Sequence, residues 1–170
     1  MAVAGLFYTD CVKTKLATFQ IVATQKGLVQ INFPKHRDFS PRTQRDIPAS
    51  VQRTFHRAKK YLKAILYHEN GNQGATAPVD WSQFRPFERS VYKALCRISL
   101  GKTISYSELA KKAGHFRAAR AVGNAMNRNP IPIVIPCHRV IRKDQTLGGY
   151  RAGLRWKRLL LNLEQGRGLI

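Results

Sequence analysis

The chain has 170 residues, enough for one medium domain or two small ones, and its 44% hydrophobic content can build a core. Thirty Lys and Arg against nine Asp and Glu give a formal net charge of +21, which predicts a polyanionic partner. No apolar run approaches the roughly 18 to 20 residues of a membrane span, and the amino terminus lacks the pattern of a secretory signal. These observations argue against a membrane span and show no secretory signal, so we expect an intracellular protein. Nucleic acid and an anionic membrane surface both fit the charge, and we expect nucleic acid to be the partner.

The cysteines and histidines show no metal-binding or disulfide pattern. Cys11, Cys96 and Cys137 are widely separated without a Cys-x-x-Cys spacing, and the five histidines are equally scattered. We therefore expect neither a disulfide framework nor a metal, and no cofactor.

The first 34 residues have the pattern of strands. Residues 19–23 and 28–33 flank a turn at residues 25–27, which predicts a hairpin or a small meander. Ser50 is a candidate N-cap for a helix that ends near Asn70 and Gly71. The apolar positions of this helix recur at helical spacing: Val51, Phe55, Ala58, Leu62, Ile65 and Leu66.

A small, polar stretch at residues 72–80 reads as a linker, and we place a domain boundary there, giving domains 1–79 and 80–170. The first part carries 12 basic and 4 acidic residues, and the second carries 18 and 5. The net charges are therefore +8 and +13, and the expected nucleic-acid surface lies mainly in the second part.

The second part opens with a predicted helix at residues 86–99, which places Cys96 in the core. Ser105 and Glu108 have the spacing of a capping box, so a short helix to Lys112 follows. A turn at residues 114–115 leads into a second helix at 116–127, giving the size and order of a helix-turn-helix.

That second helix has two chemically different faces. Five residues can pack inward: Ala118, Ala119, Val122, Ala125 and Met126. Arg117, Arg120, Asn124 and Asn127 lie on the other side. Gly123 costs helix stability of roughly 1 kcal/mol, for which close approach to another surface would compensate. The face can therefore contact DNA, although a solvated helix face would also explain its arginines.

The most informative stretch is residues 129–140, in which three prolines and four aliphatic residues precede Cys137. We expect it to be stiff, extended and buried. A buried cysteine is usually inert, but His138 can accept the thiol proton and Arg139 adds positive potential, and both favour the nucleophilic thiolate.

The carboxyl-terminal part contributes two further candidates. Gly148 and Gly149 permit tight backbone before Tyr150, which is either a pocket wall or a half-buried structural residue. A last helix at residues 154–165 carries Glu164, which is either turned inward or solvated.

Together these motifs resemble those of the O6-alkylguanine-DNA alkyltransferases, also called methylated-DNA--protein-cysteine methyltransferases. The resemblance covers most of residues 80–170 and rests on these segments: Gly-Lys-Thr-Ile-Ser-Tyr (101–106), Ala-Arg-Ala-Val-Gly (119–123), Asn-Pro (129–130), Ile-Pro-Cys-His-Arg-Val (135–140), Gly-Gly-Tyr (148–150) and Leu-Leu-Leu (159–161) with Glu164. It implies an α+β fold, with a small amino-terminal sheet and helix (RNase H-like) and a mainly helical carboxyl-terminal domain with a helix-turn-helix.

The resemblance also implies the chemistry. Cys137 would irreversibly take the O6-alkyl group of guanine, and the methyl group of O4-methylthymine, from duplex DNA. His138 would accept the thiol proton through a water while Glu164 orients the histidine. Tyr106 would donate a hydrogen bond or proton to the departing guanine; its alternative role is to pack on the neighbouring helix. Asn129 would stabilise the turn before the cysteine.

The same resemblance implies how substrate is held. Arg120 would replace the flipped nucleotide in the minor groove. The other expected DNA contacts are Tyr106, Arg117, Ala121, Gly123, Asn124 and Arg128. The expected pocket residues are Pro132, Val140, Gly149, Tyr150 and Met126. The expected partner is double-stranded DNA containing O6-alkylguanine, bound by a monomer that can act cooperatively. The expected location is the cytoplasm, at the nucleoid in a prokaryote, or the nucleus in a eukaryote.

Three other functions would each explain part of the sequence pattern. A relative that binds alkylated bases without reacting would lack the acceptor thiol, which Cys137 supplies. A helix-turn-helix regulator would leave the Cys-His-Arg segment idle, and a cysteine hydrolase would not need the DNA-binding surface.

Overall fold

The computed structural model describes residues 6–34, 46–67 and 77–167, and the chain divides into two compact units, Met1–Gln83 and Phe84–Ile170. The boundary lies slightly later than the composition suggests. Asp80 belongs with the first unit because its amide donates to Leu28 O at 2.9 Å and its carboxylate accepts from Thr24 Oγ1 at 2.7 Å.

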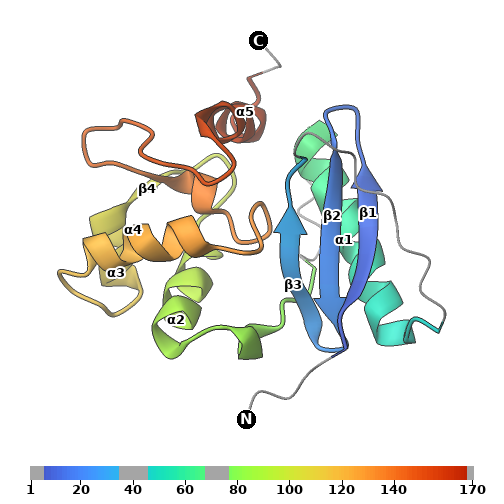
Figure 1. The fold of residues 1–170 in the computed structure, drawn as a ribbon. Coiled ribbons are helices and arrows are strands. Elements are labelled where there is room, and N and C mark those ends of the chain that lie inside the picture. Colours follow the sequence, from blue (N-terminus) through green and yellow to red (C-terminus); the bar gives the residue numbers. More distant parts are fainter. Residues whose placement is uncertain (1–5, 35–45, 68–76, 168–170) are drawn as a thin grey trace. The chain divides into compact units, whose positions relative to one another are not determined.

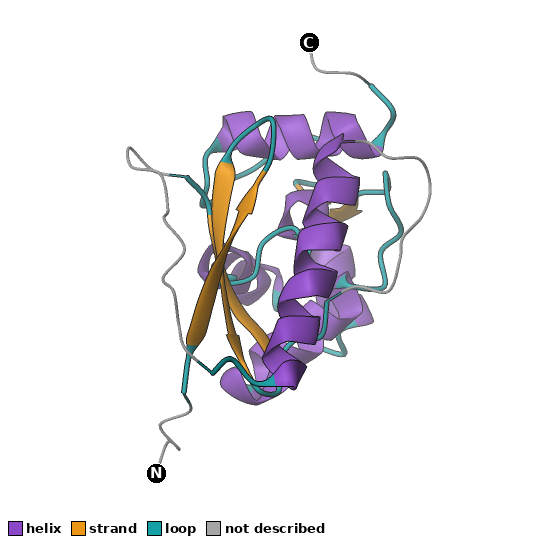
Figure 2. Cartoon of the chain, turned by 90° about the vertical axis from the view of Figure 1, so that its right-hand side faces the viewer, coloured by secondary structure: helices purple, strands orange, loops and turns teal. Residues whose placement is uncertain are grey.

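The first unit is an antiparallel meander of β1 (Tyr8–Lys13), β2 (Thr18–Thr24) and β3 (Gly27–Asn32), in the order β1-β2-β3. Helix α1 (Ala49–Tyr67) contacts all three strands (Figures 1 and 2). The six apolar residues expected on its inner face are all buried. The predicted meander and helix are therefore confirmed.

The start of α1 differs from the prediction. The helix begins at Ala49, and Pro48 O accepts hydrogen bonds from the amides of Val51 and Gln52, so Ser50 already lies inside it. Its expected end near residues 70–71 falls outside the described residues. A short 3₁₀ turn, η1 (Trp81–Gln83), closes the unit.

The second unit is mainly helical, which confirms the α+β class. It contains α2 (Pro86–Leu95), α3 (Tyr106–Lys112), α4 (Ala119–Arg128), the 3₁₀ turn η2 (Cys137–Arg139) and α5 (Leu154–Glu164). Strands β4 (Ile104–Ser105) and β5 (Val140–Ile141) form a parallel pair (Figure 1). In the described part of the chain no helix is long and apolar enough to cross a membrane.

Helix α2 is shorter than its apolar pattern suggests. It ends at Leu95, and Cys96, which caps it, is exposed. The prediction that Cys96 is a core residue is therefore wrong. The predicted helix at residues 86–99 is too long because residues 96–98 form a turn after Leu95.

The pair α3 and α4 follows the prediction except at one boundary. Ser105 and Glu108 form both bonds of the capping box at the start of α3. Helix α4 begins at Ala119 instead of residue 116, because Phe116 is 75% exposed and Arg117 has a positive φ of 63°. Arg117 thus lies in the turn before α4, not on the helix.

The stretch before Cys137 is buried as expected but it is not extended. Ile135 N donates back to Ile131 O at 2.9 Å, and Ile133 has a positive φ of 73°. Its prolines therefore support a compact turn, and Cys137 opens a single 3₁₀ turn. The thiol is fixed by this turn instead of by a strand.

Candidate active site

Cys137 is only 6% exposed, and its sulfur accepts a hydrogen bond from the side chain of Asn129. Asn129 Nδ2 donates to Cys137 Sγ at 3.1 Å and to Ile135 O at 2.8 Å. The other end of this amide, Oδ1, accepts from Ile131 N at 3.0 Å. The nearby Tyr150 hydroxyl also acts to lower the pKa of the thiol. Asn129 therefore joins the end of α4, the turn and the thiol through one side chain.

Glu164, near the end of α5, is the hub of a buried polar network. Its Oε1 lies 2.7 Å from His138 Nε2, and Arg139 binds both carboxylate oxygens, with Nε and Nη2 each at 2.8 Å. Gly101 N donates to Glu164 Oε2 at 3.2 Å, and Arg139 Nη1 donates to Ile98 O at 2.6 Å. The carboxylate is thus surrounded by donors.

A glycine permits this close packing. Gly101 has a φ of 71°, and a Cβ there would lie 2.9 Å from Glu164 O. Any other residue would push α5 away and separate the amide of residue 101 from the carboxylate.

The network defines which nitrogen of His138 can act as a base. Burial alone would raise the pKa of Glu164, but the hydrogen bonds from His138 and Arg139 and the charge of Arg139 lower that pKa to about 2. Burial also lowers the pKa of His138, so its imidazole is neutral at rest. Because an ionised carboxylate only accepts hydrogen bonds, Nε2 carries the proton and Nδ1 has the free lone pair. Nδ1 is buried and has no hydrogen-bond partner among the described residues.

Lys157 is a second cation in this region, and it is completely buried. Its ammonium donates to Val140 O at 2.6 Å, to Gly149 O at 3.4 Å and to Leu147 O. Burial lowers the pKa of Lys157 to about 8. The ammonium therefore ties α5 to both ends of the loop that follows β5.

Burial is also the largest influence on the thiol, and it raises the pKa of Cys137. The hydrogen bond from Asn129 and the positive charge of Lys157 oppose this effect. The thiol is thus protonated at rest, and it needs a base to become a nucleophile. Arg139 does not supply the positive potential expected from its position in the sequence, because its guanidinium is turned to Glu164.

Tyr106, the first residue of α3, lies between α4 and the loop before Tyr150. Its ring is 3.9 Å from where a Cβ of Gly123 would stand, and its hydroxyl is 2.9 Å from that of Gly148, which has a φ of 63°. Burial raises its pKa. The phenol is therefore a neutral hydrogen-bond donor that contacts both elements.

Comparison with known proteins assigns this site to a family. Residues 86–166 match the model of the 6-O-methylguanine DNA methyltransferase, DNA binding domain. The methylated-DNA--protein-cysteine methyltransferase of Methanosarcina barkeri is 39% identical over 165 residues, covering 93% of this chain and 97% of the relative. The inducible Bacillus subtilis protein of that name is 38% identical over 151 residues, covering 86% and 84%. The chain belongs to the methylated-DNA--protein-cysteine methyltransferases.

Solved structures agree with this assignment. The Mycobacterium tuberculosis O6-methylguanine methyltransferase has a TM-score of 0.73 at 28% identity and covers 96% of each chain. The Mycobacterium tuberculosis OGT in complex with DNA has a TM-score of 0.73 at 30% identity, covering 95% of this chain and 94% of that one. The protein is thus an enzyme that repairs alkyl damage in DNA by methyl transfer to a cysteine.

In this methyltransferase the other expected site residues fall into two groups. Helix α4 buries Val122, Ala125 and Met126 and exposes the residues expected to face DNA: Arg120, Ala121, Asn124 and Arg128, with Arg117 in the preceding turn. Arg128 also pairs with Glu88 at 3.0 Å. Of the expected pocket residues, Val140 is buried, Pro132 and Tyr150 are half-buried and Gly149 is exposed.

The sequence alone missed one residue of the methyltransferase site, Lys157, and one pairing, that of Arg139 with Glu164. Lys157 precedes Leu160, Leu161 and Glu164 by three, four and seven residues, so helical spacing puts it on the same face of α5 as these buried residues. It was missed because a lysine is usually expected to keep its ammonium in water. The pairing of Arg139 with Glu164 joins residues 25 apart and has no local signal. No group of three or more His, Cys, Asp or Glu that could hold a metal occurs in the described residues.

Proposed function

We propose that Cys137 takes the O6-alkyl group of guanine, and the methyl group of O4-methylthymine, from duplex DNA, once per protein molecule. The observation that carries this proposal is the joining of His138 to an ionised Glu164 through Nε2, next to a buried thiol. Because Nε2 is bound to Glu164, Nδ1 of His138 is left to act as the base for the neighbouring thiol of Cys137, which is protonated at rest.

The reaction begins with a proton transfer. The proton of Cys137 leaves to His138 Nδ1 through a water, and the Glu164 carboxylate stabilises the imidazolium that forms. Lys157 and Asn129 favour the thiolate by charge and by hydrogen bonding.

The thiolate then attacks the alkyl carbon. A sulfur–carbon bond forms as the bond from carbon to O6 breaks, and the bonding electrons pass to the guanine. Tyr106, a neutral phenol, donates a hydrogen bond or its proton to the departing base. The product is a thioether that has no proton to lose, so the protein acts only once.

Substrate reaches this site by base flipping. Helices α3 and α4 act as a helix-turn-helix in the minor groove, which is about 6 Å wide and suits the small residues Ala121 and Gly123. Arg120 enters the base stack in place of the extruded nucleotide, offsetting part of a flipping cost of a few kcal/mol. Arg117, Asn124 and Arg128 contact the backbone, while Pro132, Met126 and Tyr150 border the alkylated base.

The protein works as a monomer that can bind cooperatively along DNA, at the nucleoid of a prokaryotic cytoplasm or in a eukaryotic nucleus. The charge of +21 supports a weakly sequence-dependent, salt-sensitive search along DNA. A repair rate that did not vary with salt would count against that search.

The proposal is tested by titration. Increasing amounts of a duplex with one O6-methylguanine are added to a fixed amount of protein, and the methyl groups transferred are counted. Transfer should stop at one methyl per protein, and O4-methylthymine should compete for the same capacity. Continued turnover, or transfer by Cys137→Ser, would overturn it. Binding of the duplex by Cys137→Ser is the control for folding.

A further inference from the structure

Every exposed residue of α1 from Arg53 onward is basic. The helix carries five Lys and Arg and no Asp or Glu. Its exposed basic residues recur at intervals of three and four: Arg53, His56, Arg57, Lys60 and Lys63. At 3.6 residues per turn they fall within about a third of the helix circumference and extend over about 15 Å. We call these five residues the α1 stripe.

Three cations of the α1 stripe are not neutralised by the part of the chain that the structure describes. Arg53, Lys60 and Lys63 form no ion pair within residues 6–34, 46–67 and 77–167. Asp10, which reaches α1 from β1, is already used, since it pairs with Lys59 at 2.6 Å. The α1 stripe thus keeps positive charge for a partner from outside.

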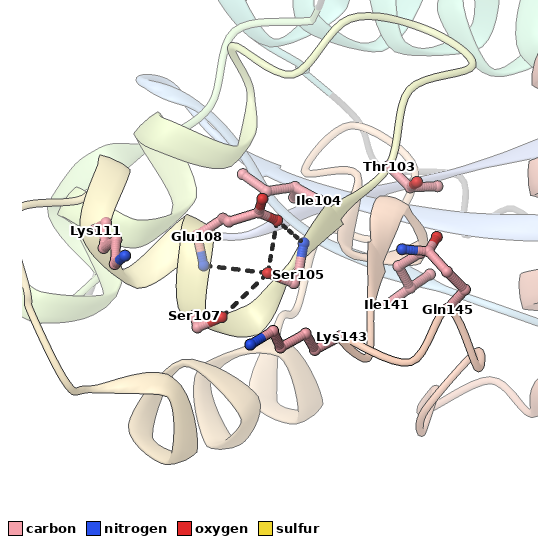
Figure 3. Close-up of a pocket in the computed structure, with 9 residues that line it drawn as sticks. All are labelled: Thr103, Ile104, Ser105, Ser107, Glu108, Lys111, Ile141, Lys143 and Gln145. Carbon is pink, nitrogen blue, oxygen red and sulfur yellow. Dashed lines mark hydrogen bonds between the residues drawn. The ribbon is translucent and has the colours of Figure 1, made fainter.

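Helix α3 differs from α1 because its exposed face mixes acidic and basic residues. Glu108 and Lys111 line the same pocket (Figure 3). An acid and a base at this spacing stabilise a helix, whereas like charges four residues apart destabilise it. In α1, Arg53 and Arg57 are four residues apart. The α1 stripe therefore costs the helix some stability, which a bound polyanion would restore.

The other face of α1 decides between an anionic membrane and nucleic acid as the partner. Eight residues of that face are buried, and the helix packs against all three strands of the sheet (Figure 2). An amphipathic helix binds a membrane by inserting its apolar face, which in α1 belongs to the core. The α1 stripe suits a phosphate backbone better, because one strand of duplex DNA presents about four phosphates over 15 Å.

We propose that the α1 stripe is a second DNA-binding surface, which holds the phosphate backbone of duplex DNA without reading its sequence. Arg and Lys contacts to phosphates position a protein on DNA but carry no base recognition. The stripe belongs to the first unit, whereas the residues of α3 and α4 expected in the minor groove belong to the second. The inference goes beyond the proposed function, because it requires neither a damaged base nor base flipping. It also gives a role to part of the charge of +21.

The α1 stripe has a measurable electrostatic signature on a long, undamaged duplex. Each phosphate contact releases counterions and adds about 0.9 to the size of the slope of log K against log salt concentration. The triple variant Arg53→Gln, Lys60→Gln and Lys63→Gln should therefore reduce the slope by about 2.7. A fourfold rise in salt should then weaken the wild type about 40-fold more than this stripe variant.

The matched control removes three exposed cations from β1 and the two turns of the same meander. This control variant carries Lys13→Gln, Lys15→Gln and Lys26→Gln, so it has the same net charge as the stripe variant. It should keep the wild-type slope, and circular dichroism should show unchanged folding in both variants because all six side chains are exposed. An unchanged slope in the stripe variant, or equal decreases in the two variants, would overturn the inference.

Acetylation of lysines locates the contact on the protein. The wild type is treated with an acetyl ester of N-hydroxysuccinimide at low salt, with and without the undamaged duplex, and its peptides are weighed. Lys60 and Lys63 should react several-fold more slowly with DNA present, while Lys13 and Lys26 should react at the same rate. Equal protection of all four would overturn the stripe but leave the proposed function intact, because no methyl transfer to Cys137 is involved.

Two further arms separate this inference from a membrane surface and from the proposed function. Binding to phosphatidylserine vesicles should fall equally in the stripe and control variants, as an effect of net charge. A loss confined to the stripe variant, with its DNA slope unchanged, would assign the stripe to a membrane and overturn the inference. Both variants should still take one methyl group per protein from a saturating damaged duplex. Failure of the wild type to do so would overturn the proposed function and not the stripe.

Discussion

Glu164→Gln tests the polar network most sharply. The substitution keeps the size of the side chain but removes its charge and replaces one acceptor oxygen by a donor. Arg139 is 5% exposed and donates to both oxygens of Glu164, so the variant leaves a buried guanidinium without its counter-ion. Breaking a buried ion pair from one side costs about 3 to 5 kcal/mol, and we expect a loss of this size in the free energy of unfolding.

The pH dependence of the free energy of unfolding gives a second estimate of the contribution of Glu164. The pKa of Glu164 is about 2 in the folded protein, below its ordinary value of 4.5. A lowered carboxyl pKa stabilises the folded state above the unfolded pKa, and this stabilisation is lost as pH falls from about 4.5 to 2. The shift corresponds to about 3 kcal/mol. Glu164→Gln should lose this part of the acid dependence.

Urea unfolding at pH 7, 4 and 3 measures both effects. Glu88→Gln is the matched control, because it removes a carboxylate that pairs with the exposed Arg128 at 3.0 Å and should cost below about 1 kcal/mol. Similar losses in the two variants, or an unchanged acid dependence in Glu164→Gln, would refute the central place of Glu164 in the network.

Three further predictions concern the thiol and the DNA. Cys137→Ser should abolish methyl transfer while gel shifts still detect duplex binding; transfer by this variant would mean that another residue is the acceptor. Arg120→Ala should slow repair of duplex substrate by roughly ten- to a hundredfold in single-turnover assays, because no side chain then replaces the flipped nucleotide in the base stack. The control Arg155→Ala, which removes another exposed arginine, should repair at the wild-type rate. A wild-type rate for Arg120→Ala would contradict its insertion into the stack. Lys157→Met should slow alkylation of Cys137 by iodoacetamide below pH 8, where the lysine of the wild type is charged and favours the thiolate. Above pH 8 the lysine loses its proton, so the rates of variant and wild type should converge. A constant difference between the two rates across that range would refute an electrostatic role.

Local signals in the sequence were sufficient for much of the fold. Alternation and a turn predicted the meander, and the Ser105–Glu108 spacing predicted the start of α3. The errors lie where tertiary contacts decide. Apolar spacing extended α2 through Cys96, and no local rule predicted the left-handed conformation of Arg117 that delays α4.

Part of the candidate site could also be predicted from local signals in the sequence. Cys137, His138 and Glu164 came from a motif and a helical position, and the structure brings them together. The burial of Lys157 depends on carbonyl groups from residues 140, 147 and 149, whose convergence is a property of the folded loop. The turn at residues 131–135 was predicted as extended because prolines fit both conformations.

The mass of the peptide that contains Cys137 tests the central claim most directly. The protein is incubated with an excess of duplex carrying O6-methylguanine, then digested, and the three cysteine peptides are weighed. The peptide of Cys137 should gain one methyl group, while those of Cys11 and the exposed Cys96 stay unchanged. An unmodified Cys137 peptide with damage still in excess, or a methyl group on Cys96, would contradict the account.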